Sequence, residues 1–242
     1  MDEVRLIPVK GLPLVSQGDN LAEMIVDHSS VEIEDGDVLV IAQKIVSKAE
    51  GAVVDLNTIT ASPEAEEISK QTGRDARLVQ VYLDEATEVI RIKGRMVITR
   101  HKLGFKMSSS GVDKSNVAPK DKMIVVLLPK DPDASCRRLR DDIKASTGKN
   151  VAVIMNDSLG RDDRDGSIGL AIGIAGISHL DFRKQTDLFG NEANSRIALI
   201  DELAAAGSIL MGQANESVPA VIIRGVPFLK DEEASIKKIL NL

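Results

Sequence analysis

Aromatic residues and cysteine are scarce in this chain of 242 residues, which has four Phe, one Tyr, no Trp and one Cys. The hydrophobic core must therefore consist of Ile, Leu, Val, Ala and Met, and few rings are available to stack on single-stranded nucleic acid. The single cysteine, Cys136, excludes a disulfide within the chain and a cysteine metal cluster. A reducing cytoplasm is compatible with this composition.

An excess of positive charge is also missing, because the formal net charge is −6 at pH 7. No overall field therefore attracts the protein to DNA or RNA, and we expect no nucleic acid partner. No apolar run reaches the length of about 18 residues that a membrane-spanning helix needs. The first five residues are mostly charged and do not resemble a signal peptide. These absences predict a cytoplasmic protein without a membrane partner.

The length and the hydrophobic content of 43% are those of an ordinary globular protein with a substantial core. Predicted helices and strands alternate, but hairpins and long polar loops interrupt any regular βαβ rhythm. The sequence therefore predicts a mixed α/β fold of the α+β type rather than a doubly wound sheet. We expect a single catalytic domain over residues 1–242, with room for a division into two subdomains.

Hydrophobic periodicity and capping residues predict the individual elements. Helices are expected at 20–27, from 62 onward, at 75–85, 131–148, 196–213 and 231–240. Strands are expected at 4–9, 38–44, 88–92, 96–100, 123–128, 166–176 and 219–225, and from 151 to about 156. The segment 104–117 is small and polar without periodicity, which predicts a loop.

The segment 151–161 is the most informative stretch, because an apolar run leads directly into Asp157, Ser158, Gly160 and Arg161. This pattern is typical of a buried strand that ends at the carboxyl edge of a sheet, where α/β proteins bind ligands. Asp157 is ionisable, Ser158 can coordinate a cation or donate a hydrogen bond, and Arg161 can bind a phosphate or carboxylate. The alternative is an ordinary polar turn after a strand.

Two acidic residues, Asp113 and Asp157, both follow small or apolar residues at expected turns. If they converge with an amide such as Gln213 or Asn116, they form an all-oxygen site for a hard divalent cation. Such sites usually hold the metal through substrate phosphates as well, and Lys48, Arg161 and Arg224 could neutralise phosphate charge. The alternative is that both carboxylates cap turns through their own backbone.

Other candidate motifs carry little weight. The sequence has no Walker phosphate loop, and the glycines at 169, 173 and 176 lack the spacing of a dinucleotide fold. Cys136 lies in a charged helix, and the three histidines, His28, His101 and His179, lack metal-ligand spacing. We therefore expect structural or exposed positions for all four residues.

Taken in order, a series of short motifs resembles the coenzyme F420-0:L-glutamate ligase (F420-0 gamma-glutamyl ligase) family over about residues 5–226. The motifs are Gly11-Leu-Pro-Leu, Gly36-Asp-Val-Leu-Val-Ile, Val46-Ser-Lys-Ala-Glu-Gly51, Gly111-Val-Asp-Lys-Ser-Asn-Val117, Leu128-Pro-Lys-Asp-Pro-Asp-Ala-Ser135, Asp157-Ser-Leu-Gly-Arg161, Ala171-Ile-Gly-Ile-Ala-Gly176, Asp201-Glu-Leu-Ala-Ala-Ala206, Leu210-Met-Gly-Gln213 and Pro219-Ala-Val-Ile-Ile-Arg-Gly225. Each string is weak alone, but the ordered set is specific.

The resemblance implies a GTP-dependent ligase that adds L-glutamate to coenzyme F420-0 through an acyl phosphate. It also implies Mg²⁺ or Mn²⁺, a monovalent cation such as K⁺, a homodimer, and a mixed α/β fold that lacks a Walker loop. The family requires metal ions that bridge phosphate oxygens and stabilise the charge that develops during transfer.

The same resemblance assigns site residues. It implies Asp113, Asp157, Ser158 and Gln213 as metal ligands, and Asp113, Asp157 and Arg161 as catalytic residues. It places the nucleotide beside two groups of residues. The first is Leu12, Pro13, Leu14, Val15, Ser47, Lys48 and Asn116, and the second is Gly212, Gln213, Ala214, Asn215 and Glu216.

Two departures from the family pattern leave Asp113 and Asp157 unchanged. They bear on which acceptor the enzyme uses. Ser109 and Ser110 stand where the family commonly has a small Asn-Ala pair, and Asp162 and Asp163 replace a Pro-aromatic run. A related ligase acting on a different acceptor is therefore one alternative. A nucleotide-binding homologue without catalysis is another, although the retained acids argue against it.

Overall fold

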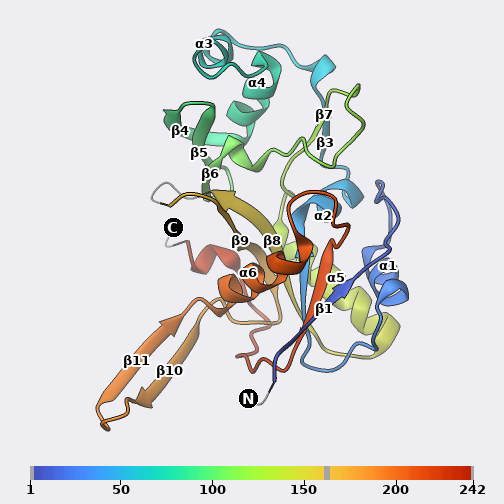
Figure 1. The fold of residues 1–242 in the computed structure, drawn as a ribbon, viewed down its shortest axis with the longest axis vertical. Coiled ribbons are helices and arrows are strands. Elements are labelled where there is room, and N and C mark those ends of the chain that lie inside the picture. The colour runs from blue at the N-terminus through green and yellow to red at the C-terminus, as the bar shows by residue number, and fades with distance from the viewer. Residues whose placement is uncertain (1–2, 161–163, 241–242) are drawn as a thin grey trace.

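A computed structural model describes residues 3–160 and 164–240, and it confirms the mixed α/β fold (Figure 1). The central sheet has five strands in the order β1-β12-β2-β8-β9. Their bounds are Arg5–Val9 for β1, Ala220–Arg224 for β12, Val38–Ala42 for β2, Ala152–Gly160 for β8 and Ser167–Ala175 for β9. Only β2 and β8 run parallel, so their carboxyl ends share one edge of the sheet.

Helices cover both faces of this sheet (Figure 1). Helix α5 (Pro132–Thr147) packs on one face beside α1 (Leu21–His28), and α6 (Leu199–Met211) packs on the other. Two glycines of β9 allow this close approach. A Cβ atom at Gly173 would lie 2.6 Å from the side chain of Pro132 in α5, and one at Gly169 would lie 1.9 Å from Ser208 in α6. Glycine in a strand interior is typical of such a close approach.

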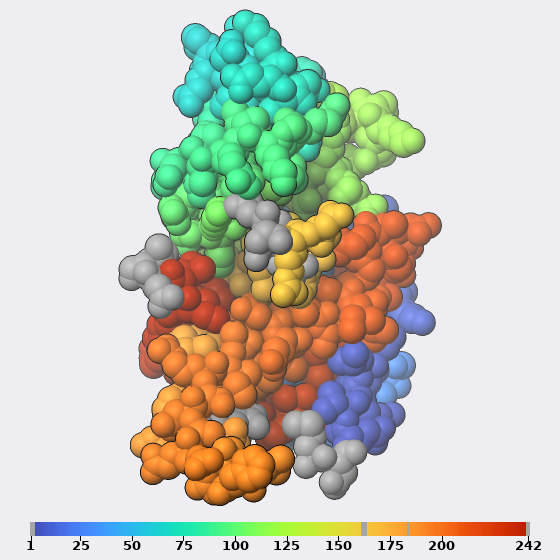
Figure 2. Space-filling view, turned by 60° about the vertical axis from the view of Figure 1, so that its left-hand side comes forward, coloured from blue at the N-terminus to red at the C-terminus, as the bar shows by residue number. Residues whose placement is uncertain are grey.

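A second hydrophobic cluster lies apart from the main core and belongs to residues 54–127. It includes residues of helices α3 (Pro63–Thr72) and α4 (Ala76–Glu85) and of strands β4 (Ala86–Lys93) and β5 (Met96–His101). Strand β6 (Lys106–Ser108) pairs with β5 but places Met107 in the main core. Figures 1 and 2 show this unit at one end of the molecule. Strands β3 (Val53–Asp55) and β7 (Ile124–Val126) pair antiparallel where the chain enters and leaves it, beside the short helix η1 (Leu56–Thr58). We refer to this cluster and its elements as the α3–α4 unit.

Capping residues identified the helix starts correctly. The side chains of Asn20, Ser62 and Asp131 accept hydrogen bonds from backbone N–H groups in the first turns of α1, α3 and α5. Pro63 occupies the first turn of α3, where its missing N–H costs nothing. Helix α5 ends at Gly148, which adopts the left-handed conformation typical of a C-terminal cap.

Three predicted elements are wrong or incomplete. Residues 43–49 form helix α2 (Gln43–Ala49) rather than the end of a strand, and no side chain caps its first turn. Residues 181–197 form an antiparallel ribbon of β10 (Asp181–Thr186) and β11 (Glu192–Ile197), so helix α6 begins later than predicted. The ribbon extends away from the body and is mostly exposed, so its sequence shows only weak hydrophobic alternation (Figure 1).

Two further segments differ from expectation. The expected loop 104–117 contains β6 and the short helix η2 (Ser109–Gly111). The expected helix 231–240 is a turn followed by the 3₁₀ helix η3 (Ile236–Lys238). There, Ser235 Oγ and Ile236 N donate to the buried Asp133 carboxylate at 2.9 and 3.0 Å, and these tertiary hydrogen bonds override local helix propensity. Across the described residues, the helices are too short or too polar to traverse a membrane.

Candidate active site

The candidate site lies at the sheet edge where β2 and β8 end their parallel pairing. The last pair is Ala42 with Asn156, so Asp157 lies one residue beyond it, and helix α2 starts directly after Ala42. Strand β8 continues to Gly160 by pairing with β9, which corrects the prediction that the strand ends before Asp157. The prediction that Asp157 lies near a carboxyl edge is confirmed, because β2 ends beside it.

The structure brings Asp113 and Asp157 together. Both line a cavity of about 220 Å³, together with Ser158. Burial, and after it the negative charge of Asp113, raise the pKa of the Asp157 carboxyl from 3.8 to about 7. Asp157 thus faces a like charge in a partly desolvated position, which is an unfavourable arrangement unless a cation shares it.

Asp113 is held in place by backbone and side-chain contacts. It exchanges two backbone hydrogen bonds of 2.9 Å with Val126 at the end of β7. Its Oδ2 atom accepts a hydrogen bond from Gln43 Nε2 at 3.3 Å and lies 3.3 Å from Lys44 Nζ. Gln43 and Lys44 were not predicted as site residues, because the start of α2 was read as part of a strand.

Helix α2 also positions two residues that the sequence did predict. Ser47 is buried, and its hydroxyl donates to Gln43 Oε1 at 2.9 Å, so it supports the amide that binds Asp113. Lys48 Nζ donates to the Asn116 carbonyl at 2.7 Å. Burial, and after it the positive charge of Lys44, lower the pKa of Lys48. Two lysines therefore lie at this edge close enough to interact.

The segment 212–216, after α6, reaches the same edge. Gln213 Nε2 donates to Ser158 Oγ at 2.7 Å, and the Ala214 carbonyl accepts from Asn116 Nδ2 at 2.5 Å. The Glu216 carboxylate accepts from Ala214 N at 2.8 Å, and these backbone hydrogen bonds lower its pKa. Asn215 is exposed beside them. Of the predicted ligands, Asp113, Asp157 and Ser158 line the cavity, and Gln213 is hydrogen-bonded to Ser158.

The loop with Leu12, Pro13, Leu14 and Val15 runs near the end of α2, where Gly18 N donates to the Ala49 carbonyl at 2.9 Å. Val15 is buried and Leu12 packs against the core, whereas Leu14 is 91% exposed. An apolar side chain this exposed is free to contact a ligand. Arg161, with its neighbours Asp162 and Asp163, lies outside the described residues.

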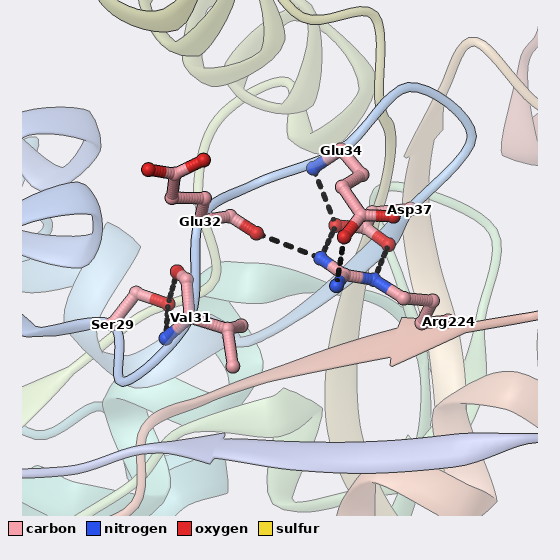
Figure 3. Close-up of polar contacts among 6 residues, drawn as sticks. All are labelled: Ser29, Val31, Glu32, Glu34, Asp37 and Arg224. Atoms are coloured by element: carbon pink, nitrogen blue, oxygen red, sulfur yellow. Dashed lines mark hydrogen bonds and ion pairs between the residues drawn. The ribbon is translucent and has the colours of Figure 1, made fainter.

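Arg224 does not belong to this site. It ends β12, which runs antiparallel to β2, so it lies at the opposite end of the sheet. Its guanidinium binds the buried Asp37 carboxylate through two hydrogen bonds of 2.8 Å, contacts the Glu34 carboxylate and donates to the Glu32 carbonyl at 2.8 Å (Figure 3). Its suggested role in neutralising phosphate is therefore wrong, since carboxylates already occupy the guanidinium.

The residues at the edge suit a hard divalent cation. Carboxylate, hydroxyl and amide oxygens are the donors that Mg²⁺ prefers, usually as one or two carboxylates plus substrate phosphates. In the parts of the chain that the structure describes, no three or more acidic, histidine or cysteine side chains form a metal-binding group. A cation at Asp113 and Asp157 would thus need oxygens from a substrate, as in phosphoryl-transfer sites.

Comparison with known proteins identifies the family of this chain. Residues 11–225 match the family described as F420-0:Gamma-glutamyl ligase. The chain belongs to this family. It is 43% identical over 230 residues to a protein named coenzyme F420:L-glutamate ligase from Methanothermobacter thermautotrophicus, with 93% of this chain and 90% of the relative covered.

Two further relatives carry the same name. The protein from Methanocaldococcus jannaschii is 45% identical over 234 residues, which cover 93% of this chain and 91% of the relative. The protein from Archaeoglobus fulgidus is 40% identical over 225 residues, which cover 92% and 88%. The F420-0 gamma-glutamyl ligase resemblance seen in the sequence motifs is confirmed.

Proposed function

We propose that this protein joins L-glutamate to coenzyme F420-0 at the expense of GTP, with Mg²⁺ or Mn²⁺ bound at the Asp113–Asp157 edge. The family membership supports the ligase reaction and its substrates. The observation that carries the assignment to this edge is the convergence of an acidic pair with Lys44, Lys48 and the 212–216 segment. Acidic side chains can bind the metal, and lysines can bind the phosphates of a nucleoside triphosphate.

In this proposal, Asp113 and Asp157 hold the metal, with Ser158 and Gln213 as further oxygen donors. When bound, the metal neutralises charge on the phosphate oxygens during transfer. Lys44 and Lys48 neutralise the remaining phosphate charge. The nucleotide lies against Leu12–Val15, Ser47, Lys48, Asn116 and Gly212–Glu216. Hydrogen bonds that connect Lys48, Asn116 and the 212–216 segment support this placement.

The reaction then proceeds in two steps. A carboxylate oxygen of F420-0 attacks the γ-phosphorus of GTP, the bond to the β-phosphate oxygen breaks, and an acyl phosphate and GDP form. The glutamate amine attacks the acyl carbon, loses a proton and expels inorganic phosphate, which leaves an amide. The buried, cation-lined edge stabilises the charges that develop in the first step by preorganised electrostatics.

Several expectations from the family resemblance stay predictions: the monovalent cation, the homodimer, the cytoplasmic location and the role of Arg161. A related ligase that acts on another acceptor is the second candidate. It is favoured by Asp162 and Asp163, which put negative charge directly after the Asp157–Arg161 motif.

The test is a reconstitution with purified protein, GTP, Mg²⁺, L-glutamate and F420-0, followed by mass spectrometry. We expect GDP and a glutamylated F420 to form together, and neither to form when the acceptor, glutamate or metal is omitted. Metal-dependent GTP binding without an F420 product would favour the second candidate. Absence of both binding and product would contradict the proposal.

A further inference from the structure

The cavity beside the acidic pair has a second wall, which the α3–α4 unit provides. Arg74 and Tyr82 line this wall, and Ser108 and Ser109 lie between it and Asp113. Nothing in the reaction outlined above uses these residues. They line the same cavity as the acids and bring a cation and hydroxyl groups to it.

Arg74 and Tyr82 form one unit. Burial raises the pKa of the Tyr82 hydroxyl, and the positive charge of the nearby Arg74 partly offsets this rise. Arg74 Nε donates to the Arg95 carbonyl at 2.8 Å, which fixes the guanidinium. No carboxylate among the described residues pairs with Arg74, whereas the neighbouring Arg77 is paired with Asp75 at 2.7 Å. Arg74 is therefore an oriented cation without an acidic partner.

A constrained turn connects the two walls. Ser109, Ser110 and Gly111 have φ angles of 55°, 50° and 65°, three successive left-handed residues that only Val112 separates from Asp113. Buried hydrogen bonds hold this turn: Ser110 Oγ donates to the Tyr82 carbonyl at 2.7 Å, and Ser110 N donates to Thr99 Oγ1 at 3.1 Å. Left-handed non-glycine residues cost energy and persist where the surroundings impose them, often at functional sites.

The size and polarity of the cavity select its occupant. A cavity of about 220 Å³ is somewhat smaller than the roughly 300–1,000 Å³ of pockets for drug-sized ligands, and it suits a small molecule such as an amino acid. One wall offers a guanidinium and hydroxyls, which bind carboxylates well. The opposite wall carries Asp113 and Asp157, at the edge where the acyl phosphate would form.

We propose that this cavity is the binding site for L-glutamate, with Arg74, Tyr82 and Ser109 holding a carboxylate so that the amine points toward the Asp113–Asp157 edge. This assignment rests on the proposed ligase function and adds the amino-acid subsite to it. Arg74, Tyr82 and Ser109 then bind glutamate, while Asp157 on β8, Asp113 beside β7 and the lysines of α2 bind metal and nucleotide.

The test is a steady-state comparison of the wild type with Arg74→Gln, Arg74→Lys and Tyr82→Phe, measuring KM separately for glutamate, GTP and F420-0. Loss of a charged hydrogen-bond partner should raise the KM for glutamate about 10- to 100-fold in Arg74→Gln. Arg74→Lys should recover part of this loss, and Tyr82→Phe should raise the KM for glutamate by less. The KM values for GTP and F420-0, and kcat, should stay within about threefold.

The matched control is Arg77→Gln, an arginine three residues along whose partner is Asp75. It should leave all three KM values unchanged, and thermal melting should show that every variant is folded. A glutamate KM that stays within about threefold of wild type in Arg74→Gln would overturn the subsite, as would a rise confined to F420-0. An inactive wild type would instead overturn the proposed function, so the two failures are distinguishable.

Discussion

Charged side chains lie at both ends of strand β2. The acidic residue at one end is paired with a base, whereas the acidic residues at the other end face each other. At the amino end, Asp37 accepts two hydrogen bonds from Arg224 and one from Glu34 N, and its side chain is 2% exposed (Figure 3). At the carboxyl end, Asp157 faces Asp113, and their mutual repulsion adds to burial in raising the pKa of Asp157.

This difference separates a structural cluster from a ligand site. The Asp37–Arg224 cluster matches acid with base, and Arg224 has a raised pKa because Asp37 hydrogen-bonds it. It therefore needs nothing from solution. The Asp113–Asp157 pair has only partial compensation from Lys44, at 3.3 Å from Asp113. Residue type alone did not distinguish the two groups, since the sequence suggested both Arg224 and Lys48 as phosphate-binding residues.

The largest expected effect is the loss of catalysis when the Asp113–Asp157 pair is changed. Asp157→Asn should lower kcat/KM by about 1,000-fold or more, because the developing phosphate charge loses its metal. The free energy of unfolding, measured by urea denaturation, should not fall, since the substitution removes a repulsion. Asp141→Asn, an exposed carboxylate on α5, is the matched control. A stability loss with retained activity would contradict the comparison.

Changes to the Asp37–Arg224 cluster should instead reduce stability and leave activity intact. Arg224→Met leaves the buried Asp37 charge without its partner, and such losses cost about 3–5 kcal/mol of unfolding free energy. Activity of the folded protein should stay within about twofold, because the cluster lies far from the reacting groups. The double variant Asp37→Leu with Arg224→Met should be more stable than Arg224→Met alone. If the two substitutions were simply additive, the cluster would not act as a pair.

A smaller effect is expected from Gln213, whose amide donates to Ser158 at 2.7 Å. Gln213→Ala should weaken Mn²⁺ binding about 10-fold, since groups that orient metal ligands typically contribute 10- to 100-fold to affinity. A Mn²⁺ titration followed by electron paramagnetic resonance measures this change. Gln185→Ala, on the exposed ribbon, provides the control. Equal affinities in the two variants would remove Gln213 from the site.

The smallest effect concerns a third pair, Glu85 with His101, in the α3–α4 unit. The His101 imidazole, whose Nε2 lies 3.6 Å from Glu85 Oε2, and the positive charge of Lys102 lower the pKa of Glu85 below its usual value of 4.5. A lowered carboxyl pKa contributes stability that is present above about pH 4.5 and is lost as the pH falls below it. Glu85→Gln should reduce that pH dependence by up to about 1 kcal/mol, measured by urea denaturation between pH 6 and about 3.5. An unchanged pH profile would show that the pair contributes nothing.

Much of the fold followed from local signals. Asn20, Ser62, Pro63 and Asp131 marked helix starts correctly because capping depends on neighbouring backbone groups alone. Helix α2 was missed because Ile45 and Val46 extend the apolar run of β2 and no polar side chain caps the helix. The β10–β11 ribbon was missed because the half-buried positions of β11 are Ala193, Ser195 and Ile197, which give too weak a hydrophobic alternation to predict a strand.

The site was predictable in its acids but not in its supporting residues. Asp157 was recognisable because an apolar strand led into it, and Asp113 because its motif matches the family. Lys44 and Gln43 reach Asp113 only through the start of α2, and Arg74 reaches the cavity only because the α3–α4 unit folds over it. Such contacts depend on tertiary structure, which no local pattern in the sequence encodes.

The most direct test of the central claim is a crystal structure with GDP and Mn²⁺, with the anomalous scattering of manganese used to locate the ion. The unsatisfied acidic pair predicts an anomalous peak bound by carboxylate oxygens of both Asp113 and Asp157, next to the β-phosphate of GDP. A manganese ion bound elsewhere, with the two carboxylates free of metal, would contradict the claim that this sheet edge is the catalytic centre.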